Sequence, residues 1–293
     1  LQHVAVAADP WPGAVAVWRS ADGESFGLHS VLPVPAILGR TLSALSGGPV
    51  WSWDERTRLE VEISSGGWPT VTPEAALAGE TVFAVRGQDG GWEVLAARSA
   101  DLIGPRRYRL SGFLRGLGGT EHFASRTVPA GADLVRLDGA VAPLSSSLSD
   151  LGRTWTYRIG PADRGHADPA AIEIAATIGA GALKPLAPVH PRARRVAGGV
   201  AVSWIRRARL DGDGWEMAEI PLGEEVEAYE LAILDSLGGE KRAFATAAPA
   251  VLYGAADELA DFGVPQAELT LRIAQLSRTA GRGHELLRTV PVL

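Results

Sequence analysis

Hydrophobic and polar residues alternate over much of the chain, which is the pattern of β-strands with one buried face. Residues 58–63 read RLEVEI, in which three apolar residues alternate with three charged ones. Residues 81–86 and 92–96 are two more β-rich runs on either side of a Gly-containing turn, and we expect them to form a hairpin. Residues 14–19 run into an Asp-Gly turn and predict another hairpin.

Helix signals are few and short. Thr72-Pro73-Glu74 offers an N-cap, a proline at the first helical position and an early acid, so one short helix is expected there. Single helical turns are expected at 111–117 and 254–260. The prediction is therefore an all-β, multi-domain chain of antiparallel β-sandwiches with one- or two-turn helices.

A proline-rich run marks the clearest domain boundary. Residues 184–191 read KPLAPVHP, a stiff, extended stretch suited to connecting domains. We expect a β-rich region over 1–187, in which 1–38 and 154–187 could form one sandwich around an inserted β-domain at 39–153. After the prolines come VAVSW at 200–204, YELAIL at 229–234 and LRIAQL at 271–276, and together they resemble a fibronectin type III domain over 188–293.

Composition narrows the classes of function. The chain has 293 residues, a formal net charge of −6 and no cysteine, which argues against nucleic acid as the main partner and excludes disulfides and thiol chemistry. No apolar run is long enough to span a bilayer. The single methionine is Met217, so we expect the natural protein to extend upstream of Leu1.

Residues 108–122 read YRLSGFLRGLGGTEH, with four glycines in eight residues. A nucleotide-binding P-loop needs a lysine after its last glycine, and here Gly119 is followed by Thr120. A dinucleotide fingerprint would need glycine where Glu121 stands. The glycines therefore predict a tight corner after the strand Tyr108–Leu110.

Candidate chemistry is weak elsewhere. Asp211–Glu216 reads DGDGWE and is reminiscent of a calcium loop, but the position of the final glutamate ligand is Leu222, which favours a plain hairpin turn. The six histidines are scattered, and the acidic clusters show no pair facing across a cleft. We predict no catalytic, cofactor-binding or metal-binding residue in this chain.

Aromatic and basic residues are the candidates for contact surfaces. Turn tryptophans can stack on sugars or fill protein interfaces, although plugging the ends of β-domains is the more common role. Two arginine clusters could form a basic edge facing an acidic partner or simply a solvated strand face. The candidate interface residues are Trp11, Trp51, Trp53, Trp68, Arg192, Arg194, Arg195, Arg206, Arg207 and Arg209.

The glycine-rich segment also resembles a family signature. RYRLS at 107–111, FLRG at 113–116 and GTE at 119–121 are similar to the YRLSxLLRGxxGTE motif of tail-tip proteins from gene transfer agents and siphophages, called megatron or host-specificity proteins. Further segments match in order: VWRSADG at 17–23, WEVL at 92–95, DLI at 101–103, LVRLD at 134–138, TYRIGP at 156–161, LKPLAPVH at 183–190 and SWIRR at 203–207.

This resemblance implies the carboxy-terminal region of a long baseplate protein, made in the bacterial cytoplasm and built into the tail tip of a virion-like particle. It implies a homotrimer with hub, distal-tail and peptidase-like tail proteins as partners and a cell-surface glycan or receptor as target. Any hydrolase-like domain would lie upstream, so no enzyme activity is expected here. The alternative is a carbohydrate-binding, fibronectin-type accessory region of a secreted polysaccharide-degrading enzyme.

Overall fold

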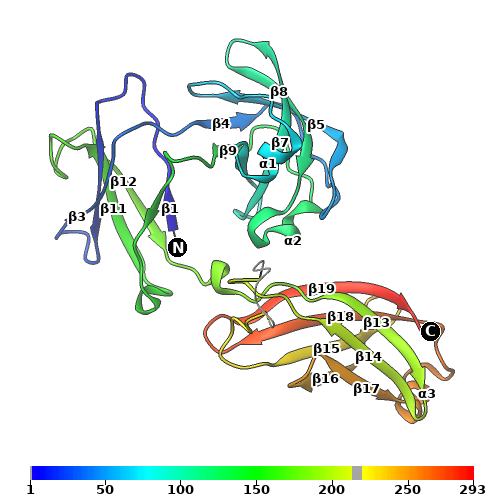
Figure 1. Ribbon diagram of the computed structural model, residues 1–293. Coiled ribbons are helices and arrows are strands. Elements are labelled where there is room, and N and C mark those ends of the chain that lie inside the picture. The colour runs from blue at the N-terminus through cyan, green and yellow to red at the C-terminus, as the bar shows by residue number, and fades with distance from the viewer. Residues whose placement is uncertain (1, 213–219) are drawn as a thin grey trace. The chain divides into compact units, whose positions relative to one another are not determined.

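The computed structural model describes residues 2–212 and 220–293 and divides into two compact units, residues 1–179 and 180–293 (Figure 1). Antiparallel strands dominate both units and the helices are short, which confirms the all-β, multi-domain fold class. The division falls eight residues before the boundary expected from the prolines. The backbone N–H of His284 donates to the carbonyl oxygen of Pro185 (2.9 Å), so the proline-rich run packs onto the second unit.

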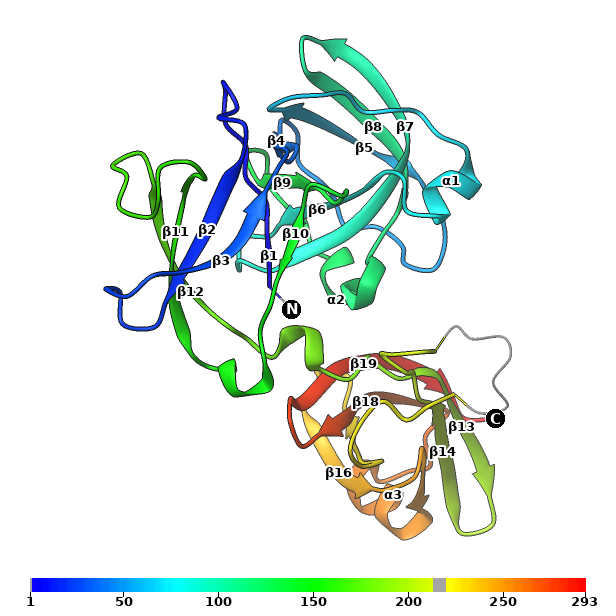
Figure 2. The same cartoon turned by 60° about the vertical axis from the view of Figure 1, so that its left-hand side comes forward.

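A closed antiparallel barrel occupies residues 38–136 (Figure 2). Its strands, in spatial order, are β4 (Leu38–Thr41), β5 (Asp54–Ile63), β8 (Arg107–Leu114), β7 (Trp92–Gly104), β6 (Val82–Arg86) and β9 (Asp133–Arg136). The alternating RLEVEI segment behaves as predicted, because Leu59, Val61 and Ile63 are buried in the barrel core. Closure pairs every strand on both sides and leaves no sheet edge open.

Short helices lie between the barrel strands. The helix α1 (Pro73–Leu77) confirms the expected capping, because the Thr72 hydroxyl accepts a hydrogen bond from the backbone N–H of Ala75 (3.3 Å). A single 3-10 turn, η1 (Leu117–Gly119), and the helix α2 (Glu121–Ala124) follow β8.

The glycine corner lies later than the sequence suggested. β8 continues through residues 111–114 because Ser111 pairs with both β5 and β7 and Phe113 is fully buried, so no helical turn forms at 111–117. The chain turns instead at Gly116, whose φ of 65° lies in the left-handed region. A Cβ atom there would lie 2.5 Å from the Cα of Glu121, so only glycine fits without backbone movement.

Besides the barrel, the first unit contains two small antiparallel sheets. The larger sheet has the order β12 (Ile172–Thr177), β11 (Thr154–Pro161), β2 (Val15–Ser20) and β3 (Gly27–Leu32), and the smaller sheet pairs β1 (Gln2–Val4) with β10 (Ala142–Leu144). A 3-10 turn, η2 (Leu148–Asp150), precedes β11. Because β2 pairs with β11, segments before and after the barrel join in one sheet, and the barrel lies between them in the chain.

The second unit is an antiparallel β-sandwich, in which residues 180–212 and 220–293 form seven strands in two sheets. One sheet has the order β13 (Val189–Val196), β14 (Gly199–Ile205) and β17 (Ala250–Gly254), and the other β16 (Glu240–Thr246), β15 (Tyr229–Leu234), β18 (Glu268–Ser277) and β19 (Gly281–Pro291). The 3-10 turn η3 (Gly181–Leu183) precedes β13, and α3 (Ala255–Phe262) links β17 to β18. Trp204 packs edge-on against Tyr229 in the core.

Two glycines of the corner provide a matched test. Gly116 and Gly118 have nearly the same φ (65° and 61°), but a Cβ at Gly118 would meet nothing within 4 Å. We expect Gly118→Ala to lose about 1–2 kcal/mol of unfolding free energy through backbone strain alone, and Gly116→Ala to lose clearly more. Urea unfolding of the full chain measures both, and equal losses would contradict this account of the corner.

Candidate functional site

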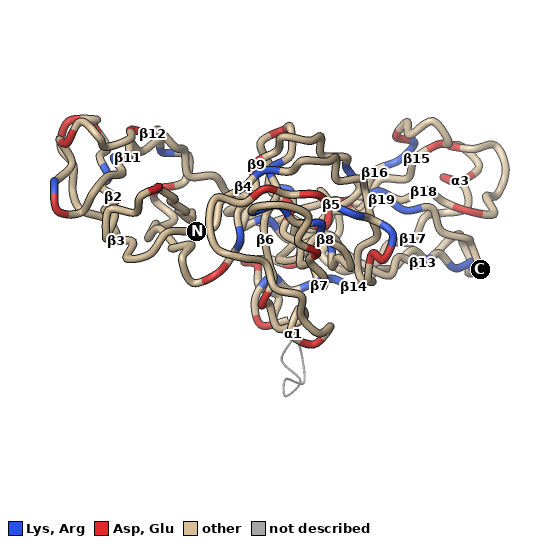
Figure 3. The backbone as a smooth tube through the Cα atoms, turned by 90° about the horizontal axis from the view of Figure 1, so that it is seen from above, with Lys and Arg blue, Asp and Glu red and all other residues tan. Residues whose placement is uncertain are grey.

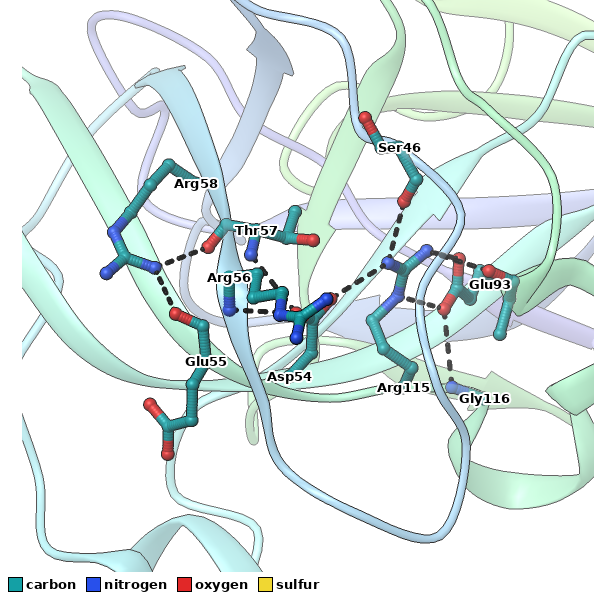
Figure 4. Close-up of polar contacts among 10 residues, drawn as sticks. Ser46, Asp54, Glu55, Arg56, Thr57, Arg58, Glu93, Arg115 and Gly116 are labelled. Carbon is teal, nitrogen blue, oxygen red and sulfur yellow. Dashed lines mark hydrogen bonds and ion pairs between the residues drawn. The ribbon is translucent and has the colours of Figure 1, made fainter.

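A buried ion pair lies at the end of β8, inside the glycine-rich motif. The Arg115 guanidinium binds the Glu93 carboxylate of β7 through two hydrogen bonds, Nε to Oε1 (2.6 Å) and Nη2 to Oε2 (2.8 Å). The two side chains are 0% and 1% exposed. Figure 4 shows the guanidinium between Glu93 and Asp54. Such two-point pairing fixes direction as well as distance, which a lysine could not do.

The same guanidinium holds the loop of residues 46–54, which we call the Trp51 loop. Arg115 Nη1 donates to the carbonyl oxygen of Ser46 (2.9 Å) at one end, and it lies 3.8 Å from Asp54 Oδ2 at the other. Between these points, Val50 forms a β-bridge with Arg115 itself. The loop is therefore attached to Arg115 at its start, its middle and its end.

Glycine and aspartate adapt the loop to the buried charge. A Cβ at Gly48 would lie 2.5 Å from Asp54 Oδ2 and 2.7 Å from Arg115 Nη1, so a larger residue would separate the ion pair. Asp54 Oδ1 accepts the backbone N–H groups of Arg56 and Thr57 (3.1 Å each). Burial raises the pKa of Asp54, but the hydrogen bonds from Thr57 and Arg56 and the charge of Arg115 together hold this pKa below its ordinary value.

The Trp51 loop presents one aromatic ring to solvent. Trp51 is 69% exposed and its φ of 68° lies in the left-handed region, which is unusual for a bulky residue. Trp53 is half-buried, with the Arg98 guanidinium carbon 5.3 Å from the centre of its ring. Arg98 also pairs with Glu55 (2.9 Å). Of the four candidate tryptophans, Trp51 is the most accessible.

The structure places the other two tryptophans differently. Trp68 is 5% exposed and packs edge-on against Phe83 in the barrel core, so the prediction of an interface role for Trp68 is wrong. Its neighbours Gly67 and Pro69 suggested a surface turn, but the turn directs the ring inward. Trp11 is half-buried and packs against the apolar cluster of the first unit that includes Val17 and Tyr157. Its indole N–H donates to the carbonyl oxygen of Gly13 (3.0 Å).

The first arginine cluster lies on β13 and does not act as one group. Arg192 and Arg194 are exposed, whereas Arg195 makes two hydrogen bonds with the buried carboxylate of Glu258 on α3 (2.5 and 3.1 Å). Arg195 therefore ties α3 to the strand. Arg195 is exposed as well, but its guanidinium is engaged with Glu258 and does not extend a basic edge with Arg192 and Arg194.

The second arginine cluster forms hydrogen bonds with the backbone of residues 220–223. Arg206 donates to the carbonyl oxygens of Pro221 (2.8 Å) and Ile220 (2.6 Å), and Arg209 donates to that of Gly223 (3.4 Å). Arg207 is half-buried. The DGDGWE segment at 211–216, for which a plain hairpin turn is predicted, lies mostly outside the described residues. Arg206 and Arg209 are thus engaged within the unit.

Sites for other chemistry are limited. Within residues 2–212 and 220–293, no group of three or more His, Asp or Glu side chains is placed to hold a metal ion. Over the same residues, no helix combines the length and apolar character needed to cross a bilayer. Charged residues of both signs are interspersed along the chain (Figure 3). A hollow of about 960 Å³ is lined mainly by apolar side chains of the first unit.

Sequence reasoning missed the role of Arg115, Glu93 and Asp54. The segment FLRG placed an arginine between two apolar residues and a glycine, and this is the signal of a charge drawn into a core. Its partners could not be named, because Glu93 and Asp54 lie on other strands and reach Arg115 only through the barrel register.

The barrel segment of the chain matches a known family model. A family model described as Rcc01698-like, C-terminal, matches residues 36–135, the segment that forms the closed barrel and contains the Arg115 cluster. No curated protein sequence matches the chain.

Three solved structures give weak similarities. They are chicken CNTN1 FN1–FN3 domains (10% identity, TM-score 0.25, 85% of this chain covered), the Spr0440 glycoside hydrolase domain of Endo-D from Streptococcus pneumoniae R6 (12%, 0.21, 83%) and a beta-1,2-glucanase from Parabacteroides distasonis (10%, 0.23, 86%). The chain spans 65%, 32% and 36% of those chains. Similarities of this size carry no functional inference.

The buried pair predicts a large difference in stability cost between Arg109, which lies in β8, and Arg115, which directly follows it. We expect Arg115→Gln to lower the free energy of unfolding by about 3–5 kcal/mol, because Glu93 would remain buried without its partner. Arg109→Gln breaks a half-exposed pair with Glu60 and should cost less than about 1 kcal/mol. Urea unfolding of both variants measures this, and similar costs would contradict a buried clamp.

Asp54 predicts a pH dependence. Its folded pKa lies below the ordinary value of 3.8, so the stability it contributes is present above about pH 4 and is lost as the pH falls through the folded pKa. Asp54→Asn should therefore be less stable than the wild type at pH 7, and the difference should shrink below about pH 4. Unfolding at pH 7, 4 and 3 tests this, and a difference that grows on acidification would refute it.

Proposed function

We propose that this chain is a structural module of the tail tip or baseplate of a phage-tail-like particle of the gene transfer agent type. The observation that carries the proposal is the match of the family model to residues 36–135, which include the whole YRLSGFLRGLGGTEH segment. In this role the chain contributes to assembly and to attachment at, or penetration of, a bacterial surface.

The architecture is consistent with a scaffold. A closed barrel and a β-sandwich are stable supports that leave their loops available for contacts. We propose that the chain itself is not an enzyme, that it forms a homotrimer, and that hub, distal-tail and peptidase-like tail proteins are its neighbours. A hydrolase-like domain of the full-length protein would then act from another part of the polypeptide.

A second candidate function is favoured by one observation, the exposed ring of Trp51. An accessory module that binds polysaccharide for a secreted enzyme would also present such a ring. The two candidates differ in where the protein is found, on particles or free in the medium.

Labelling of intact particles tests the leading proposal. Leu237 is 95% exposed at the tip of the β15–β16 hairpin, so a short peptide tag inserted between Leu237 and Gly238 should leave the sandwich folded. Electron microscopy of particles from the bacterium that encodes the protein should show antibody against the tag at the distal tail end. Untagged particles are the control.

Label found on the head, or a tagged protein absent from purified particles, would contradict the proposal. Recovery of the tagged chain free in the medium together with polysaccharide-degrading activity would support the second candidate instead.

A further inference from the structure

The exposed indole of Trp51 is attached to a backbone whose left-handed conformation is unfavourable for this residue. A left-handed backbone for a residue other than glycine costs about 1–2 kcal/mol, and such strain persists only where the surroundings enforce it. The enforcing contacts are the attachments of the Trp51 loop to Arg115, at Ser46, Val50 and Asp54. Gly48 adds a fourth attachment through its N–H to the carbonyl oxygen of Ala124 (2.8 Å). The ring is therefore presented by a fixed loop.

Basic residues follow the Trp51 loop in the chain and contact the neighbouring ring of Trp53. Arg56 and Arg58 are exposed just beyond the loop, and the Arg58 guanidinium donates to the backbone carbonyl oxygens of Glu55 and Thr57. Arg98 stands over Trp53 and pairs with Glu55. Of these three arginines, only Arg98 pairs with a carboxylate, that of Glu55, in a chain whose formal net charge is −6.

We infer that this surface, made of Trp51, Trp53, Arg56, Arg58 and Arg98, binds an acidic polysaccharide. A flat indole can cover the C–H face of one sugar ring, and guanidinium groups beside it suit the carboxylate or phosphate groups of neighbouring units. The inference goes beyond the leading proposed function, and it names the class of glycan that the second candidate would bind. It can be tested with the isolated chain.

Two other partners fit less well. A protein interface has a cluster of apolar side chains at its centre, but three of the five residues that make up this surface are arginines. Single-stranded nucleic acid is bound by successive aromatic side chains on which its bases stack. Here Trp51 is exposed, but Trp53 is half-buried.

Titration calorimetry with the full chain tests the inference. The probes are an oligogalacturonate, a phosphate-bearing glycan oligomer, a neutral cello-oligosaccharide, polyglutamate and an oligothymidylate. We expect binding to one or both acidic glycans, weakened by added salt, with the two acidic probes distinguishing carboxylate from phosphate as the recognised group. Binding to the neutral glycan should be at least tenfold weaker.

Matched variants separate recognition from folding. Trp51→Gly removes the ring and relieves the backbone strain, so it should raise the dissociation constant about tenfold or more without lowering the thermal midpoint. Arg56→Ala should weaken binding several-fold, whereas Arg164→Ala, which removes an exposed arginine of the β11–β12 connection, should leave it unchanged.

Four results would overturn the inference. They are no binding to either acidic glycan, equal binding to polyglutamate, tighter binding to the oligothymidylate, and unchanged affinity in Trp51→Gly. None of them would affect the location of the chain on a particle, so failure here and failure of the proposed function are distinguishable.

Discussion

The position of the Trp51 loop on the barrel depends on the bidentate ion pair between Arg115 and Glu93. Removing two charges from water is unfavourable unless their geometry and remaining hydrogen bonds compensate. Arg115 meets this condition because its other donors reach the carbonyl oxygens of Ser46 and Ala124. The pair therefore links β8 and β7 to a loop that has no regular structure of its own.

This arrangement also explains the glycines around it. Gly116 lets the chain turn directly after Arg115, and its backbone N–H donates to the Glu93 carboxylate (3.3 Å). Gly48 allows the loop to approach Asp54 and Arg115 closely. A motif that fits no phosphate-binding template is thus the local solution for bringing a guanidinium into a barrel core and turning the chain immediately afterwards.

Much of the fold could be predicted because burial leaves a periodic trace. The alternation in 58–63, the capping at Thr72 and the strand around Trp204 each depend on near neighbours in sequence, and each lies in an element of the expected type. The corner after β8 was placed too early because the pairing of Ser111 and Phe113 with two other strands extends the strand.

The candidate site was less predictable because it depends on contacts between distant residues. Trp51 and Trp68 each have a glycine and a proline within three residues in sequence, yet one ring is exposed and the other lies in the core. Arg195 and Arg206 each belong to a run of basic residues in the sequence. In the structure, Arg195 is hydrogen-bonded to Glu258 and Arg206 to the backbone carbonyl oxygen of Ile220. Only the register of the strands decides which charges are buried.

The central claim is that Arg115 fixes the Trp51 loop, and amide hydrogen exchange over residues 46–54 tests it most directly. Arg115→Lys keeps the charge but loses the planar fork. We predict that the amide of Gly48 is protected in the wild type and exchanges much faster in Arg115→Lys, while peptides from β18 are unchanged. A loop that exchanges at the same rate in both proteins would contradict the claim.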